Sequence, residues 1–137
     1  MPEISILSNK NIIMCNAKIY SETFEAKEIF CDILLIMPDF KINNMKITTK
    51  IAIIYGDAPF SNLHSISFKK IITYGMSSKN TATISSMCQN DLLLAIQREI
   101  TNINGNIIQI GEYKSENITE NQLETLGLTL LSMINSS

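Results

Sequence analysis

Two short polar segments, each at the end of an apolar run, contain the residues best suited to bind a ligand. One run ends in Tyr55-Gly-Asp57 and the next in Thr73-Tyr-Gly75. If both runs are parallel strands, their carboxyl ends meet at one edge of the sheet, which is where open α/β sheets bind ligands. A carboxylate at this edge can act as a general acid or base without a histidine. The predicted ligand-binding residues of these two segments are Asp57, Thr73, Tyr74 and Gly75.

The same residues also have a purely structural interpretation, which the sequence leaves open. Asp57 can cap a turn with its carboxylate, and Gly75 can supply a left-handed backbone conformation. Two other carboxylates, Asp39 and Glu112, lie near the ends of other apolar runs and are further candidates for acid–base chemistry.

Several common chemistries lack their residues in this chain. A phosphate-binding loop needs the pattern GxxxxGK[ST], and a dinucleotide site needs GxGxxG; neither is present. The one histidine, His64, is expected on the surface of a connecting segment. The three cysteines are not spaced as zinc ligands and are expected to be free thiols in a reducing compartment: Cys15, Cys31 and Cys88. We therefore expect no metal, no cofactor and no catalytic residue.

Composition indicates one folded domain spanning residues 1–137. Hydrophobic residues make up 45% and charged residues 18%, and the net charge is −2. The densest basic spot is Lys69-Lys70, which is too small to hold several phosphates, so nucleic acid is not an expected partner. The start of the chain lacks a secretory signal pattern, and the apolar runs are far shorter than the roughly 20 residues that span a bilayer. We expect a cytoplasmic protein that does not bind membranes.

Three continuous apolar runs predict buried strands: Ile33–Ile36, Ile51–Tyr55 and Ile71–Tyr74. About 14 to 16 residues separate consecutive runs, enough for a parallel crossover. These features predict an α/β fold with a small, largely parallel sheet and short right-handed crossovers. We expect at most one or two helical turns in the crossovers, near Phe40, Met45 and Ser61–Ser65.

The two ends of the chain have different patterns. Ile4–Leu7 and Ile12–Tyr20 are strand candidates joined by a turn, and Ser21 is a candidate cap for a short helix. Further on, Thr81–Ser86 alternates as a strand does. Asn104-Gly105, flanked by two strand-like segments, predicts an antiparallel hairpin from Asp91 to Tyr113, because both turn residues tolerate positive φ.

Leucines at helical spacing predict a terminal helix from Thr119 to Ile134. Thr119 and Gln122 have the spacing of a capping box, so Thr119 is the expected cap. The helix has a broad apolar face. Any part of it left uncovered favours dimerisation.

The order of these segments from Ile51 onward resembles the later half of the central domain of Mur ligases, the ATP-dependent peptidoglycan amino-acid ligases. The segments that match are a strand with an acidic turn, a strand ending in Thr-Tyr-Gly, a hairpin, and an Asn-containing segment before the helix: Ile51–Pro59, Lys70–Gly75, Asp91–Tyr113 and Glu116–Asn121. The chain is also similar to small Mur-ligase-like proteins of clostridia-type bacteria.

The resemblance implies descent from half of that domain, and it adds Asn117 to Asp57 as a candidate pocket residue. Four departures argue against ligase activity. The phosphate-binding loop is missing, and the chain has no room for the two flanking ligase domains. The Asn that usually precedes the family's acidic pair is replaced around Tyr55-Gly56, and Glu116 replaces the family's His.

Three hypotheses follow. The leading one is a non-enzymatic domain of Mur-ligase-like descent that binds a protein, either a second copy of itself or a protein of cell-envelope biosynthesis. The alternative is a small-molecule or enzymatic site at the edge near Asp57 and Gly75. The third is a phage or mobile-element protein whose fold only mimics this layout.

Overall fold

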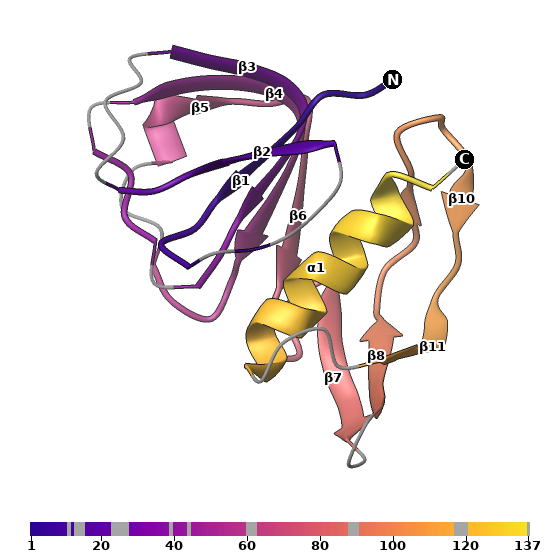
Figure 1. Ribbon diagram of the computed structural model, residues 1–137. Coiled ribbons are helices and arrows are strands. Elements are labelled where there is room, and N and C mark those ends of the chain that lie inside the picture. The colour runs from indigo at the N-terminus through magenta and orange to yellow at the C-terminus, as the bar shows by residue number, and fades with distance from the viewer. Residues whose placement is uncertain are drawn as a thin grey trace.

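The chain forms a mixed α/β fold in which one helix packs on a mostly parallel sheet of nine strands (Figure 1). A separate two-stranded antiparallel sheet lies beside it. The computed structural model describes residues 1–10, 12, 16–22, 28–38, 40–43, 45–59, 63–87, 91–116 and 121–136. Asp39 and Asn117, both predicted from sequence, lie outside these residues, as do Cys15 and Cys88.

The three predicted buried strands are confirmed as parallel neighbours. They are β3 (Glu28–Ile36), β4 (Lys46–Tyr55) and β6 (Lys70–Tyr74), with β4 in the middle. Tyr55 and Tyr74 face each other at the carboxyl ends of β4 and β6. The two polar segments that follow these strands therefore begin side by side, as the sequence predicted.

The amino-terminal strands extend the sheet beyond β3. They are β1 (Ile4–Leu7) and β2 (Ala17–Tyr20), and both run parallel to their neighbours. Ser8, Asn9 and Lys10 of the predicted turn follow β1, and Asn11 lies outside the described residues. The second strand is shorter than the predicted Ile12–Tyr20, because Ile12 and Asn16 are not in a strand. The helix predicted after Ser21 falls mostly on residues 23–27, outside those described.

In the described part of the connection between β4 and β6, one turn of 3₁₀-helix, η1 (Leu63–Ser65), is followed by the short strand β5 (Ile66–Ser67), which pairs with β4. The turn lies within the segment predicted to be helical. Phe40 and Met45 are not helical. Their side chains are buried, because the connection that carries them covers an apolar face of the sheet.

The remaining strands form an antiparallel extension of the sheet. They are β7 (Ala82–Met87), β8 (Asp91–Ile96) and β11 (Gly111–Glu116). β7 joins β6 through a single parallel pair, Tyr74 with Ala82. The predicted hairpin is confirmed, but it is not separate from the main sheet, since β8 and β11 belong to it.

The tip of the hairpin forms the separate two-stranded sheet, from β9 (Ile100–Thr101) and β10 (Ile107–Ile108). Gly105 has a φ of 84°, whereas Asn104 does not have the predicted positive φ. The Asn102 side-chain oxygen instead accepts hydrogen bonds from the backbone N–H groups of Asn104 and Asn106, both at 2.9 Å. This oxygen fixes the turn.

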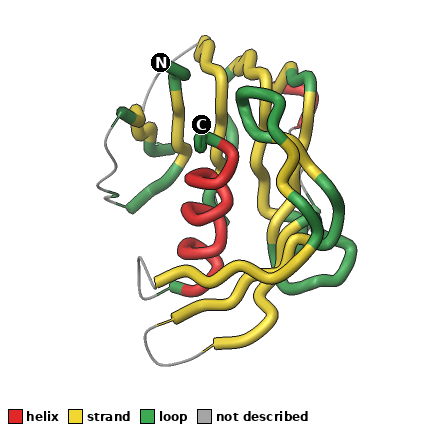
Figure 2. Tube along the Cα trace, turned by 90° about the vertical axis from the view of Figure 1, so that its right-hand side faces the viewer, coloured by secondary structure: helices red, strands yellow, loops and turns green. Residues whose placement is uncertain are grey.

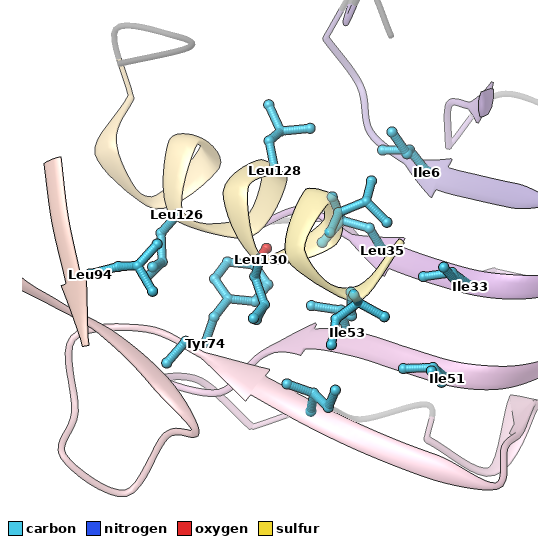
Figure 3. Packing of buried hydrophobic residues seen from close by; sticks show 14 of the residues in the cluster. Ile6, Ile33, Leu35, Ile51, Ile53, Tyr74, Leu94, Leu126, Leu128 and Leu130 are labelled. Atoms are coloured by element: carbon cyan, nitrogen blue, oxygen red, sulfur yellow. The ribbon is translucent and has the colours of Figure 1, made fainter. Parts of the chain in front are cut away.

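The terminal helix α1 (Gln122–Ile134) lies along one face of the sheet (Figure 2). Its cap is Asn121, whose side chain accepts a hydrogen bond from the Glu124 N–H at 3.1 Å; the predicted cap, Thr119, lies outside the described residues. Leu126 points from the helix towards Leu94 of the sheet, and Leu130 points towards Tyr74 (Figure 3). None of the described helices is long and apolar enough to cross a membrane.

A second apolar cluster lies on the opposite face of the sheet. Strand residues Leu34 and Ile54 contribute to it, and Phe40, Ile42 and Met45 of the β3–β4 connection cover it. The carboxyl-terminal halves of β3 and β4 are therefore buried on both faces, which explains why their sequences are continuously apolar. β6 is buried only on the helix side, and its Ile71 is 38% exposed on the other.

Candidate functional site

The predicted site lies where the turns after β4 and β6 meet. The Gly56 N–H donates to the Tyr74 carbonyl oxygen at 2.8 Å. Asp57 then lies directly against Gly75: a Cβ atom added to Gly75 would lie 2.5 Å from the Asp57 Cγ. Gly75 does not have the predicted left-handed φ. Position 75 needs a glycine because the Asp57 carboxylate occupies the space that a side chain would fill.

The Asp57 carboxylate accepts several hydrogen bonds from the turn that follows β6. The backbone N–H groups of Met76 and Ser77 donate to it at 2.6 and 3.0 Å, and the Asn80 side-chain amide donates at 2.7 Å. Burial by itself would raise the pKa of Asp57, but these hydrogen bonds, with a further one from Tyr55, outweigh it and lower the pKa. Asp57 is therefore a charged brace between two turns.

Asn80 completes this arrangement, although it was not among the residues predicted from sequence. Its side chain is 1% exposed, and its amide also donates to the Ser77 carbonyl oxygen at 3.0 Å. No described N–H or O–H group donates to its Oδ1. A Cβ on Gly56 would lie 2.0 Å from this oxygen, so a Gly56 Cα–H points at it as a weak donor. The turn-like sequence Ser77-Ser-Lys-Asn80 was the available signal.

Thr73 and Tyr74 also take part in internal contacts. The Thr73 hydroxyl accepts a hydrogen bond from the Thr81 N–H at 3.2 Å. The Tyr74 ring is fully buried beneath the helix, and its hydroxyl donates to the Ile36 carbonyl oxygen at 2.7 Å (Figure 3). Burial raises the pKa of Tyr74 well above its ordinary value. Tyr74 is thus a core residue, with no phenol group at the sheet edge.

Of the five predicted site residues, the structure places Asp57, Thr73 and Gly75 at the carboxyl edge, whereas the Tyr74 side chain points into the core. The fifth, Asn117, lies outside the described residues. Each of the four already has a partner within the fold. Together they can hold two turns in register, and Asp57 places one negative charge at the carboxyl edge of the sheet. Binding of a small molecule at these residues stays a prediction.

The other candidate residues lie apart from this edge. His64 is exposed in η1, and Glu112 is exposed on β11, where it accepts a hydrogen bond from the Ser85 hydroxyl at 2.9 Å. Cys31 is a free, half-buried thiol, and burial is the main cause that raises its pKa. Within the described ranges, no three His, Cys, Asp or Glu side chains gather as a metal site requires.

A groove on another part of the surface was not predicted from sequence. It has a volume of about 1330 Å³ and lies at the amino-terminal ends of β3, β4 and β5, opposite to the predicted edge. Its lining includes Glu28, Phe30, Lys46, His64 and Ser67. Phe30 is 66% exposed there. No apolar run marks this half of β3 in the sequence, because its residues alternate between buried and exposed.

Comparison with family models, with curated proteins and with solved structures found no match to this chain. No family is shown. The kinship with the Mur ligases therefore stays a prediction based on the segments described above.

Proposed function

We propose that the chain is a non-enzymatic interaction domain of Mur-ligase-like descent, which works in the bacterial cytoplasm by binding a protein. The observation that carries the proposal is that the polar groups at the carboxyl edge are hydrogen-bonded to other groups of the same chain. Asp57 accepts hydrogen bonds from Met76, Ser77 and Asn80, and the Tyr74 hydroxyl is bonded within the core. An active site needs groups that are free to meet a substrate, and these groups are held by one another.

The surface of the chain supports the same proposal. Several large apolar side chains are more than half exposed: Phe30 at 66%, Ile110 at 65%, Ile107 at 60% and Met76 at 56%. Aromatic and methionine side chains are enriched at protein interfaces, and full burial of one such side chain contributes about 1.5–3 kcal/mol. The sheet also ends in edge strands, which can pair with strands of another molecule.

The proposed descent is supported by the position of the two turns. The parallel register of β4 and β6 sets Tyr55-Gly-Asp57 beside Thr73-Tyr-Gly75, as the resemblance implies. Right-handed crossovers between the parallel strands would be a further feature shared with the Mur-ligase central domain. The proposed lineage has kept the turn contacts and lost the nucleotide-binding loop, so its scaffold serves binding and not ligation.

Two measurements on the purified chain test the proposed function. The first is a thermal-shift screen against nucleotides and peptidoglycan precursors, where we expect no stabilisation. A true small-molecule site would stabilise the fold by about 2.7 kcal/mol at one hundred times the dissociation constant. The second is direct binding, either to itself by sedimentation or to a purified cell-envelope protein by calorimetry, where we expect a measurable affinity.

The proposal fails if the chain is monomeric at every concentration, binds no protein directly, and is stabilised by one of the small molecules. Asp57→Ala locates such a ligand. If stabilisation by the ligand disappears in this variant while the variant stays folded, the alternative of a site at the sheet edge replaces the interaction domain.

A further inference from the structure

Strand β11 (Gly111–Glu116) forms one end of the main sheet. Of the strands that the structure describes, only β8 pairs with it, so its other edge carries backbone N–H and C=O groups without a strand partner. An edge of this kind is a template for another strand. Charged side chains on an edge strand oppose pairing with most other strands. A strand with opposite charges at the facing positions can still pair, so the charges of β11 decide which partner it accepts.

The charges of β11 lie on one face of the sheet. Glu112 and Lys114 alternate with Tyr113 and Ser115 along the strand. The Ser115 hydroxyl shares a hydrogen bond of 2.9 Å with the hydroxyl of Thr129 on α1, so the odd-numbered side chains lie on the helix side. Glu112 and Lys114 therefore lie on the opposite side, where both are exposed.

We infer that β11 is a self-pairing edge, which binds β11 of a second copy of this chain antiparallel and centred on Tyr113. A two-fold axis perpendicular to the sheet relates such strands and keeps the helices on the same side. In this register Glu112 lies opposite Lys114 of the second copy, and Lys114 lies opposite its Glu112. Opposite charges facing each other stabilise a strand pair, and like charges destabilise it.

The charges also select this register against its neighbours. Because paired residues must lie on the same face, the strands can slide only in steps that retain the face. Centring the pair on Glu112 sets two glutamates opposite each other, and centring it on Lys114 sets two lysines opposite each other. Both shifts replace attraction by repulsion.

The existing contacts of these side chains are compatible with pairing. Lys114 forms an exposed ion pair with Asp91 at 3.2 Å, and Glu112 accepts from the Ser85 hydroxyl. Exposed contacts of this kind contribute little and can be shared with a new partner. The strand at the other end of the sheet, β2, carries one charged residue, Lys18, and offers no complementary pair.

This inference rests on the proposed function, because it names a second copy as the protein bound. The test is sedimentation velocity of the full chain over a wide concentration range, at low and high salt. We expect a reversible dimer that weakens with salt. Lys114→Glu sets like charges opposite each other twice, and we expect it to raise the dissociation constant by about tenfold or more. Glu112→Lys should have the same effect.

The double variant Glu112→Lys with Lys114→Glu restores opposite charges in reversed order, so we expect it to dimerise as the wild type does. Lys18→Glu makes the same charge change on β2 and should leave the dimer intact. A circular-dichroism melt shows that each variant is folded, and either single variant suffices if the other does not fold.

The inference is overturned if the wild type stays monomeric, if both single variants dimerise normally, or if the double variant is as weak as the single ones. A failure of this kind, combined with direct binding to another purified protein, leaves the proposed function standing. A monomeric chain that binds no protein at all overturns both.

Discussion

Replacing Asp57 by alanine should destabilise the fold, whether or not any ligand is present. The substitution removes the acceptor of hydrogen bonds from the Met76 and Ser77 N–H groups and from the Asn80 amide, at 2.6, 3.0 and 2.7 Å. Water can reach the exposed Met76, but the amide of Asn80 is buried and would lose one of its partners. The two turns would then lose their main connection.

The size of the effect follows from the number and setting of these bonds. A hydrogen bond to a charged group contributes about 1.5–3 kcal/mol, and a partly exposed carboxylate contributes less because water screens its charge. With about 1 kcal/mol for each of the three bonds, we expect Asp57→Ala to lower the free energy of unfolding by about 2–4 kcal/mol.

The effect should also depend on pH in a defined direction. The folded-state pKa of Asp57 lies below its ordinary value of 3.8, so its contribution is complete above that value and disappears as the pH falls through the folded pKa. The stability difference between the wild type and Asp57→Ala should therefore shrink as the pH is lowered from about 6 to about 2.

Urea denaturation followed by circular dichroism at several pH values measures both quantities. The matched control is Asp91→Ala, which removes an exposed ion pair with Lys114 and should cost less than about 1 kcal/mol. If Asp57→Ala cost no more than this control at neutral pH, or if its effect did not change with pH, the description of Asp57 as a brace would be wrong.

Two further substitutions test the same region. Gly75→Ala places a Cβ 2.5 Å from the Asp57 Cγ and should cost about 1–3 kcal/mol in urea denaturation; combined with Asp57→Ala, its cost should fall, and strict additivity would contradict the proposed contact. Tyr74→Phe removes the hydrogen bond to the Ile36 carbonyl oxygen and should cost about 1–2 kcal/mol, while an unchanged unfolding midpoint would show that this buried bond contributes nothing.

The sequence was sufficient to predict the parallel centre of the sheet. Ile33–Ile36 and Ile51–Tyr55 are continuously apolar because both faces of these strands are covered. Ile71–Tyr74 was also predicted as a strand, but only its Ile72 and Tyr74 are buried, on the helix side, and Ile71 is 38% exposed. The amino-terminal halves of β3 and β4 were missed. From Lys46 to Lys50, buried and exposed residues alternate, and this pattern does not stand out beside a continuous run.

The candidate site was predicted only in outline. Strand order brought Asp57 and Gly75 together, as expected from parallel strands. The role of Asn80 depends on which way its amide points after the chain has folded back, which no spacing in the sequence encodes. Tyr74 was predicted in a buried strand and also as a ligand-binding residue, and its packing against Gly127 of the helix became evident only in the structure.

Hydrogen–deuterium exchange with mass spectrometry tests the central claim most directly, because one experiment follows the sheet edge and the candidate site together. The interaction-domain account predicts that residues 111–116 gain protection as the protein concentration rises. It also predicts that residues 75–80 exchange at the same rate with or without nucleotides and peptidoglycan precursors. Concentration-independent exchange in residues 111–116, together with ligand-induced protection of residues 75–80, would contradict it.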